Sequence, residues 1–513
     1  MSIAADAARW RRIAAVVVAL LVTVMTTELA LAQFFPEAEP TNAETVFGCN
    51  PGPVEEFHHA DPPVPPARVA SPSDALRTAS LRVTTTGGRV TQGHGFNLEH
   101  TLWSCPDFRR VVDRWLLTPF QPEVARVDSG QLPFVREDAP VSELGREHYQ
   151  AIMDEPKYAP SWAMLRRLNR ENVRLMLGIW GGPGQLNDDG TRRGALLPEH
   201  AEAYADYVAS VVEYLVVRQQ VQLWSVTVAN EPDGGDGTVM SPELYVDVAG
   251  RLGPKIAPYG VTLYGPDTAS AASARPYVAA MVANPEVFQW FSAIATHEYF
   301  TAHDLAGLMA DVRAAGSNLP VYITEYTSFR YGAMDRGQEA SNEIGHMLDS
   351  LQVYASLMNA GADNAIYWDA VDYYQAGHAA VTRWGILQGP DEAFAPRDRY
   401  YGFQQILPYV QAGSTILAHE LSGPDRLAAL SVGGGDRRPG DLMIALINRS
   451  GPTQLTLTLD GPAPPDFDVY VTDTDRNLAH AGRVVVRNGT ATVSIPARSV
   501  TTLTASPPPD EGE

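Results

Sequence analysis

The stretch Leu223–Asp233, LWSVTVANEPD, predicts a buried strand that ends abruptly at a carboxylate. Its first residues are apolar and β-branched, which favours the extended conformation. Pro232 and the glycines at positions 234, 235 and 237 interrupt any regular structure beyond it. Glu231 is therefore expected at the carboxyl end of a strand, where a rigid element holds it and it faces a loop.

The same pattern recurs along the chain as an alternation of short apolar runs with helical patterns. Eight strand–helix units are predicted, with strands at 93–97, 124–128, 174–180, 223–229, 261–265, 293–299, 321–326 and 365–369. Eight such units in about 320 residues predict an α/β fold of the (β/α)8 TIM barrel type, whose active sites form at the carboxyl ends of the strands. The alternative is a doubly wound open sheet, but no glycine-rich nucleotide or phosphate loop follows the first strand to support it.

Beyond Gly413 the helical pattern stops. Short alternating runs separated by Gly, Pro, Asn and Asp predict a C-terminal antiparallel β-sandwich. We therefore divide the chain into a signal peptide or anchor (1–32), a Pro-rich leader (33–80), the catalytic barrel (81–412), the β-sandwich (413–505) and a disordered tail (506–513). Two short strands predicted around Gly87-Gly88 precede the barrel and are candidates to complete the sandwich.

The N-terminus predicts export. Three arginines precede the apolar run Ile13–Met25, and Ala30-Leu31-Ala32 has the small-x-small pattern of a cleavage site before Gln33. An uncleaved membrane anchor is the alternative. In either case the protein is expected to be secreted or extracytoplasmic, where Cys49 and Cys105 form one disulfide or remain two thiols.

The composition limits the partners. The formal charge of −22, from 60 acidic and 38 basic residues, argues against nucleic acid and against an anionic membrane surface. Contact with a membrane is expected only if the N-terminal segment stays uncleaved. We expect a monomer with a neutral or cationic partner.

A second carboxylate ends another predicted strand. Val321–Tyr326 places Glu325 at the end of the seventh strand, and Glu231 ends the fourth, so the two lie across the barrel mouth from each other. Two glutamates that face one cleft are the equipment for cleaving a glycosidic bond. Glu298 is a weaker rival, because strand alternation places it on the opposite face from its neighbours. A surface-loop position for Glu325 is the structural alternative.

Other strand ends supply residues with matching chemistry. Arg126 on strand two can pair with a carboxylate, and Tyr299 on strand six can donate a hydrogen bond to a nucleophile. His297 lies on the same face as Tyr299. Trp180 on strand three and Trp368 on strand eight can stack on sugar faces. Core packing is the alternative for the tryptophans, and a structural ion pair for the arginine.

With these residues in place, the chain resembles the retaining glycoside hydrolases of clan A, which carry Asn-Glu at the end of strand four and Glu at the end of strand seven. Within that clan it is most similar to glycoside hydrolase family 30. The motifs that carry the likeness are Gly265-Pro266-Asp267, Arg383-Trp384-Gly385 and Tyr400-Tyr401-Gly402-Phe403. The resemblance spans about residues 93–505, and it departs at the strand-one stretch 93–99 and the strand-three stretch 178–183.

The resemblance implies an O-glycosyl hydrolase that acts on an extracellular poly- or oligosaccharide by double displacement. It implies these roles: Glu231 as general acid/base, Glu325 as nucleophile, Asn230 as ligand of the sugar 2-hydroxyl, Arg126 and Tyr299 as supports of Glu325, and Trp368 as the sugar platform. No metal or organic cofactor is expected. The alternatives are a non-catalytic carbohydrate-binding or cell-envelope barrel, and a transglycosylase that uses the same two glutamates.

Overall fold

The computed structural model describes residues 76–98, 106–128, 140–234, 236–299, 304–328, 343–372, 384–389, 394–435 and 440–505. The predicted signal or anchor, nearly all of the leader, both cysteines, Arg383 and the C-terminal tail lie outside these ranges. Among the helices within them, none combines the length and the apolar character needed to cross a bilayer.

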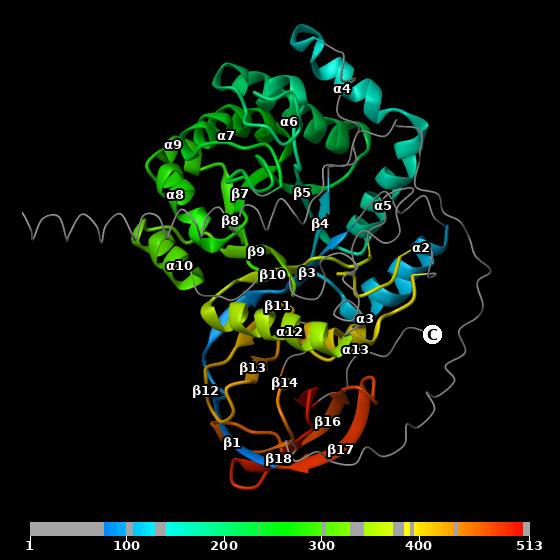
Figure 1. Ribbon diagram of the computed structural model, residues 1–513, viewed down its shortest axis with the longest axis vertical. Coiled ribbons are helices and arrows are strands. Elements are labelled where there is room, and N and C mark those ends of the chain that lie inside the picture. The colour runs from blue at the N-terminus through cyan, green and yellow to red at the C-terminus, as the bar shows by residue number, and fades with distance from the viewer. Residues whose placement is uncertain are drawn as a thin grey trace, which may run out of the picture. The chain divides into compact units, whose positions relative to one another are not determined.

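In the described part of the chain, eight parallel strands close into a barrel (Figure 1). Their order around the barrel is β10-β3-β4-β5-β6-β7-β8-β9, so the last strand pairs with the first. The strands are β3 (His94–Leu98), β4 (Val124–Asp128), β5 (Arg174–Gly178), β6 (Leu223–Thr227), β7 (Thr262–Thr268), β8 (Phe291–His297), β9 (Val321–Tyr326) and β10 (Asn364–Tyr367). The predicted TIM barrel is confirmed, and the doubly wound alternative is wrong because the sheet has no open edge.

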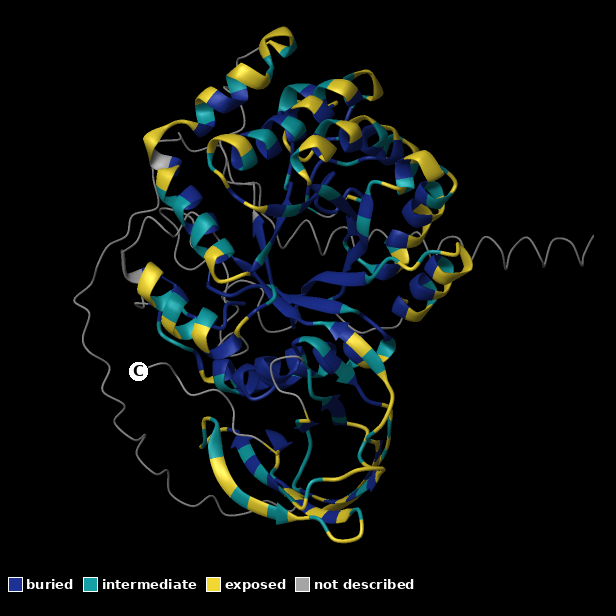
Figure 2. Cartoon of the chain, turned by 180° about the vertical axis from the view of Figure 1, so that it is seen from behind, coloured by how far each residue is buried: buried dark blue, intermediate teal, exposed yellow. Residues whose placement is uncertain are grey.

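Helices surround the barrel strands and turn their apolar faces inward (Figure 2). The α-helices are α2 (Pro106–Val111), α3 (Thr118–Phe120), α4 (Arg146–Met153), α5 (Ala159–Arg170), α6 (Ala201–Glu213), α7 (Pro242–Ile256), α8 (Ala271–Val282), α9 (Pro285–Phe288), α10 (Leu305–Ala314), α12 (Glu343–Ala360) and α13 (Asp398–Gln404). Two π-helical segments, Val112–Leu117 and Tyr214–Arg218, continue α2 and α6, and 3₁₀ turns occupy Val141–Glu143, Pro156–Tyr158, Gly184–Leu186, Pro198–His200, Ala257–Tyr259 and Leu407–Tyr409. Helix α7 begins at Pro242, because the Ser241 side chain accepts a hydrogen bond from the Leu244 amide and Pro242 suits the first turn.

The interior of the barrel is a packed core. A separate apolar cluster on alternate strand positions fills it: Val124, Met176, Tyr264, Ala293, Ala295, Tyr322 and Ile366. Because side chains alternate along a strand, the positions two residues further along β4 and β8 point inward one layer higher. Those positions are Arg126 and His297.

The C-terminal strands form two sheets that enclose a second apolar core. One sheet has the order β12-β1-β15-β18, and the other β17-β16-β19-β14-β13-β11-β2. The strands are β1 (Arg77–Thr84), β2 (Arg89–Gln92), β11 (Ala412–Ile416), β12 (His419–Ser422), β13 (Leu427–Gly433), β14 (Leu442–Asn448), β15 (Thr453–Asp460), β16 (Asp466–Thr472), β17 (Ala479–Val485), β18 (Thr490–Ile495) and β19 (Ser499–Thr504). The predicted sandwich is confirmed, although β1 and β15 pair in parallel within it.

Residues 81–92, which the domain division placed with the barrel, pair instead with the C-terminal sheets. Strand β1 lies between β12 and β15, and β2 pairs with β11. The two strands thus join the sandwich, as the alternative assignment expected, and the barrel begins at His94. The physical reason is the burial pattern, since β1 alternates exposed and buried residues whereas all of β3 is buried.

Candidate active site

The predicted site residues meet at one end of the barrel, at or just beyond the carboxyl ends of its strands. Arg126 and Glu325 lie within β4 and β9, and His297 is the last residue of β8. Strands β5, β6, β8 and β10 end earlier than predicted. Trp180, Asn230, Glu231, Tyr299 and Trp368 therefore lie on the first residues of loops.

The loop after β6 folds back on Asn230. The Asn230 side-chain amide donates to the carbonyl oxygen of Asp236 at 2.7 Å. A Cβ atom on Gly237 would lie 1.9 Å from the Asn230 carbonyl oxygen, so only glycine fits there. The backbone N–H of Glu231 donates to the carbonyl oxygen of Asp267 at 2.9 Å, which ties the loop to β7. Glu231 is thus held from both sides, with φ at +40°.

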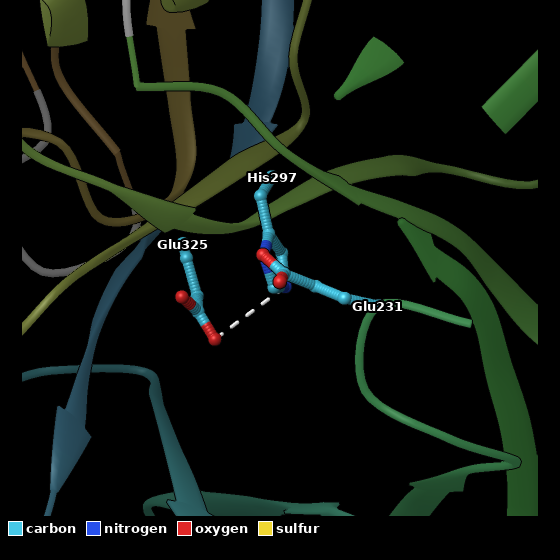
Figure 3. A group of neighbouring side chains, drawn as sticks. All are labelled: Glu231, His297 and Glu325. Carbon is cyan, nitrogen blue, oxygen red and sulfur yellow. Dashed lines mark hydrogen bonds and ion pairs between the residues drawn. The ribbon is translucent and has the colours of Figure 1, made fainter. Parts of the chain in front are cut away.

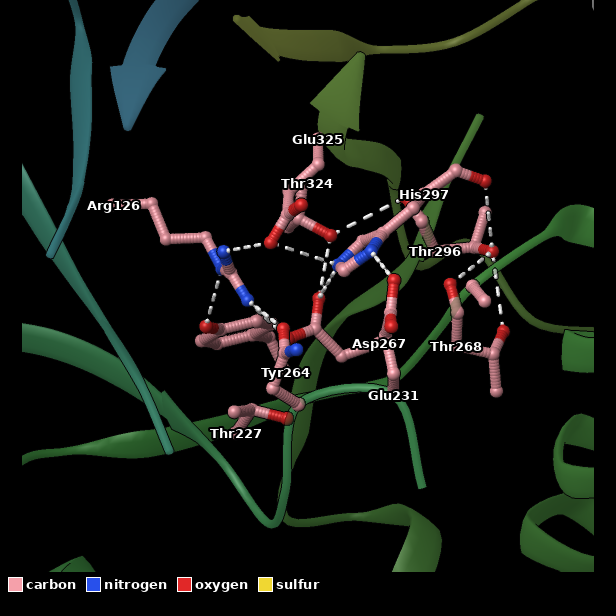
Figure 4. A network of polar contacts seen from close by, with 12 residues as sticks. Arg126, Thr227, Glu231, Tyr264, Asp267, Thr268, Thr296, His297, Thr324 and Glu325 are labelled. Carbon is pink, nitrogen blue, oxygen red and sulfur yellow. Dashed lines mark hydrogen bonds and ion pairs between the residues drawn. The ribbon is translucent and has the colours of Figure 1, made fainter. Parts of the chain in front are cut away.

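Arg126 is the centre of the polar network (Figure 4). Its side chain is fully buried. Each of its five N–H groups donates to a different acceptor: Tyr264 Oη at 3.1 Å, Asn97 Oδ1 at 2.9 Å, Glu325 Oε1 at 2.6 Å, Asn230 Oδ1 at 2.6 Å and Asp267 Oδ2 at 2.9 Å. The five hydrogen bonds hold the guanidinium among these acceptors. Arg126 therefore fixes five side chains relative to one another, and these come from β3, β7, β9 and the loop after β6.

The two glutamates approach each other across this network (Figure 3). Single ligand atoms of Glu231, His297 and Glu325 all lie within 4.8 Å of one another. His297 Nδ1 lies 2.8 Å from Glu231 Oε1, and its Nε2 lies 3.4 Å from Glu325 Oε1. The Tyr299 hydroxyl donates to the other oxygen of Glu325.

Burial raises the pKa values of both glutamates. It raises the pKa of Glu231, and the contact with His297 opposes the shift. It also raises the pKa of Glu325, but here His297, Arg126 and the Tyr299 hydroxyl all oppose the shift. Only Glu325 has a guanidinium against its carboxylate, so it is the better supported of the two in its charged form.

Asp267 is a residue of the site to which the sequence analysis gives no role. It belongs to the Gly265-Pro266-Asp267 motif, and the structure buries it completely between Arg126 and His297, with Oδ1 3.6 Å from His297 Nε2. Burial alone would favour its neutral form, but Arg126, His297 and Thr324 outweigh this and lower its pKa to about 2. The signal that marks it is a carboxylate after a Gly-Pro pair at a strand end.

Three further residues escaped the sequence analysis. Asn97 on β3 and Tyr264 on β7 accept hydrogen bonds from Arg126, and the Thr324 hydroxyl donates to Asp267. Tyr264 and Thr324 lie on strand positions that alternate inward, and residues at such positions are also expected in an ordinary core. The only signal for Asn97 is a polar residue in a strand buried on both faces.

The state of His297 follows from its surroundings. Burial alone would lower its pKa, but the charge of Glu325 and the contacts with Asp267 and Glu231 raise the pKa to about 10. The protonated imidazole faces Glu231 Oε1 across a 2.8 Å contact between Nδ1 and that oxygen.

The two tryptophans lie against each other beside Arg126. Their ring centroids are 5.8 Å apart at 31°, although β5 and β10 are not neighbours in the barrel. The Arg126 guanidinium carbon lies over the Trp180 ring, 4.2 Å from its centroid. Both indoles are half-buried.

The remaining motifs of the resemblance lie behind the site. The Tyr367 hydroxyl donates to the Trp384 carbonyl oxygen at 2.8 Å, and the Gly385 amide donates to Asp372 at 2.8 Å. These contacts anchor the chain that follows β10. Glu298, the rival carboxylate, contributes its backbone N–H to the Glu325 carbonyl oxygen at 3.0 Å.

Glu231, His297 and Glu325 are also the group of potential metal-ligating side chains found among the described residues. Their partners argue for a different use. Glu325 already contacts the Arg126 guanidinium at 2.6 Å, and Glu231 contacts the imidazole. We therefore assign no metal to this group.

Comparison with known proteins identifies the fold. No protein-family model matches the chain, and no curated protein matches it in sequence. Among solved structures, the chain is similar to a glycoside hydrolase family 30 endoxylanase from Clostridium papyrosolvens C71, with a TM-score of 0.62, 15% identity, and 83% of this chain and 99% of that one covered. It is also similar to an endo-β1,6-glucanase, with a TM-score of 0.61, 16% identity and coverages of 84% and 95%. A family 39 enzyme from Xanthomonas axonopodis pv. citri matches with a TM-score of 0.55, 14% identity and coverages of 85% and 99%. The predicted resemblance is thus confirmed in fold: the chain has the barrel and sandwich of these glycoside hydrolases.

Proposed function

We propose that this protein is a retaining glycoside hydrolase that cleaves O-glycosidic bonds of an extracellular poly- or oligosaccharide by double displacement. The observation that carries the proposal is the pair of buried glutamates, whose closest oxygens fall within 4.8 Å. Retaining enzymes place the two carboxyl groups about 5–5.5 Å apart, whereas inverting enzymes need about 6.5–9.5 Å to admit a water. The separation therefore favours retention.

In the first step, Glu325 attacks the anomeric carbon and Glu231 protonates the leaving oxygen. Arg126 and Tyr299 each hold one oxygen of Glu325, which orients the carboxylate and supports its charge. His297 supplies the proton for the leaving group to Glu231 through the contact between Nδ1 and Oε1. Glu231 thus acts as the general acid.

In the second step, Glu231 removes a proton from water, which attacks the glycosyl–Glu325 bond and restores both groups. The five charged residues Arg126, Glu231, Asp267, His297 and Glu325 keep the same total charge through both steps. Arg126 stays positive and Asp267 stays negative throughout. Before attack, the protonated His297 balances the charge of Glu231, and the remaining negative charge is on Glu325. In the covalent intermediate His297 is neutral and the remaining negative charge is on Glu231. A constant charge suits a site where most of the surroundings are fixed and buried.

The sugar is held by the residues around this pair. Asn230 uses one amide N–H for Asp236 and has a second for a sugar hydroxyl, which fits its role at the 2-hydroxyl. His297 and Trp368 border the same space and complete the proposed substrate-binding set. The N-terminal export pattern supports an extracytoplasmic location for this reaction.

The test is a screen of the mature protein on 4-nitrophenyl glycosides and polysaccharides, beside Glu325→Ala and Glu231→Ala. Glu325→Ala should lose turnover by at least about 10³-fold, and azide should restore it with an inverted glycosyl azide as product. Glu231→Ala should keep most activity on substrates whose leaving group needs no proton, and azide should give the product with retained configuration.

Three results would contradict the proposal. Identical responses of the two variants would remove the separation of roles. Binding of oligosaccharides by wild-type protein without any turnover would establish the non-catalytic barrel. Longer oligosaccharides as the main product would establish the transglycosylase.

A further inference from the structure

The Trp180 indole fills a space that a glycine leaves open. Trp180 is the second residue after β5, and its ring folds back over the end of that strand. A Cβ atom on Gly178 would lie 2.2 Å from the ring carbon Cζ3, so the indole takes this place only because residue 178 has no side chain. The ring is half-buried and lies beside Trp368 at 31°.

The partner of this ring is Arg126. All five N–H groups of Arg126 point in the plane of the guanidinium and are used by five acceptors. What is left of the guanidinium is its two faces, and the indole covers one of them, with 4.2 Å between the guanidinium carbon and the ring centroid. Guanidinium groups stack on indole rings through the ring quadrupole.

The same contact limits what else the ring can do. A sugar that stacks on an aromatic face needs that face open. One face of the Trp180 ring is taken by Arg126, and Trp368 lies against the indole as well. Trp180 is therefore poorly placed as a sugar platform, in contrast to the sequence-based expectation.

We propose that Trp180 is a positioning residue that acts through Arg126: its indole fixes the guanidinium plane, and the guanidinium in turn directs Nη1 at Glu325. This rests on the proposed function, in which Glu325 is the nucleophile. Without the indole, Arg126 keeps its acceptors but gains freedom to tilt, and water reaches its open face. The loss then falls on the reaction step and leaves substrate affinity nearly unchanged.

Kinetics on the 4-nitrophenyl glycoside that wild-type protein hydrolyses fastest test this directly. Trp180→Leu and Trp180→Met should each lower kcat about 5- to 30-fold, the range expected for a partly desolvated cation–π contact, with KM within about 2-fold of wild type. Trp180→Phe keeps an aromatic face and should recover kcat to within about 3-fold. Trp368→Leu is the comparison for a true platform and should mainly raise KM.

A double-mutant cycle supplies a second measurement, the coupling between Trp180 and Arg126. In an Arg126→Lys background the planar guanidinium is gone, so Trp180→Leu should add less than about 2-fold to the loss in kcat. Additive losses would overturn the proposal. So would a rise in KM with unchanged kcat in Trp180→Leu, or equal losses in kcat for the Phe and Leu variants.

Failure of the proposed function is visible elsewhere. It would show as turnover by Glu325→Ala at the wild-type rate, or as no turnover by the wild-type protein. If Glu325→Ala is inactive and rescued by azide while the Trp180 series moves KM alone, the hydrolase stands and the role of Trp180 falls.

Discussion

At the residue scale, the site is one buried charge network in which each carboxylate has a defined partner. Arg126 contacts Glu325 and Asp267, and His297 contacts Glu231. Removing one partner from such a group leaves another charge buried without compensation, which costs more than the contact itself. Substitution of one member should therefore change the pH dependence of kcat/KM as well as its magnitude.

Asp267→Asn tests this. The change removes a negative charge beside Arg126 and His297 while it keeps the size of the side chain. We expect kcat/KM to fall at least about 10-fold, and the basic limb of its pH profile to move to lower pH, because Asp267 helps to raise the pKa of His297 and its loss lets that proton leave at lower pH. The groups that face this cluster are Arg126, Tyr264, Tyr245, Tyr299, Asp233, Asp236 and Glu325.

The matched control is Asp311→Asn. Asp311 pairs with Arg275 at 2.6 Å on the surface, where ion pairs contribute little. Its kinetics should equal those of the wild type. An Asp267→Asn profile that superposes on that of the control would contradict the role of Asp267.

His297 also predicts how stability depends on pH. Its pKa in the folded protein is about 10, above the ordinary 6.5, so its charged form stabilises the fold. That contribution is complete below about pH 6.5 and declines until it is gone above about pH 10. Urea denaturation at pH 6 and pH 9.5 should show wild type losing more stability over this interval than His297→Asn. Equal losses would mean that the imidazole is not charged in the fold.

At the element scale, the site depends on chain segments that accept unusual backbone conformations. Glu231 and Asp267 both have positive φ, at +40° and +66°. Non-glycine residues in this region carry strain and persist where their surroundings hold them. Here the hydrogen bond from the Glu231 amide to the Asp267 carbonyl oxygen joins the two strained residues directly.

Gly237→Ala should disturb this arrangement without touching any proposed catalytic group. The new Cβ would lie 1.9 Å from the Asn230 carbonyl oxygen, so the loop must move and carry Glu231 with it. We expect kcat/KM to drop at least about 10-fold, since small displacements of an acid/base group are costly. Gly145→Ala is the control, because its Cβ would meet nothing within 4 Å. Wild-type kinetics in Gly237→Ala would show that the loop does not position Glu231.

At the scale of the whole molecule, the barrel and the sandwich share a core. Seven sandwich residues belong to the same apolar cluster as the barrel helices: Ile416, Leu430, Val432, Met443, Ala445, Ile447 and Val500. Polar contacts join the two as well. Gln405 after α13 donates to the Tyr470 carbonyl oxygen at 3.0 Å, and Arg449 pairs with Asp349 on α12 at 2.6 Å.

A shared core predicts a single unfolding transition. Calorimetry should show one peak for barrel and sandwich together, because neither can expose the common apolar surface alone. A chain that ends at Val410 should be insoluble or unfolded, because it loses those seven residues and the contacts of Gln405. Two separate peaks, or a soluble and active barrel fragment, would show that the domains are independent.

Much of this architecture is local in the sequence. The strand–helix period specifies the barrel, because each strand must bury both faces and each helix one. Among the predicted barrel strands, β4 and β9 have the observed bounds. The two glutamates were found for a related reason, since the carboxyl ends of parallel strands meet at one mouth.

What the sequence determined by itself is therefore the alternation of strands and helices, and with it the side of the barrel on which Glu231 and Glu325 lie. Only the tertiary structure decided that β1 and β2 leave the barrel for the sandwich, because their partners are more than 300 residues away along the chain. Only it placed Asp267 between Arg126 and His297, and turned the Trp180 ring onto the guanidinium. These contacts depend on distances across a closed barrel, and no sequence period carries that information.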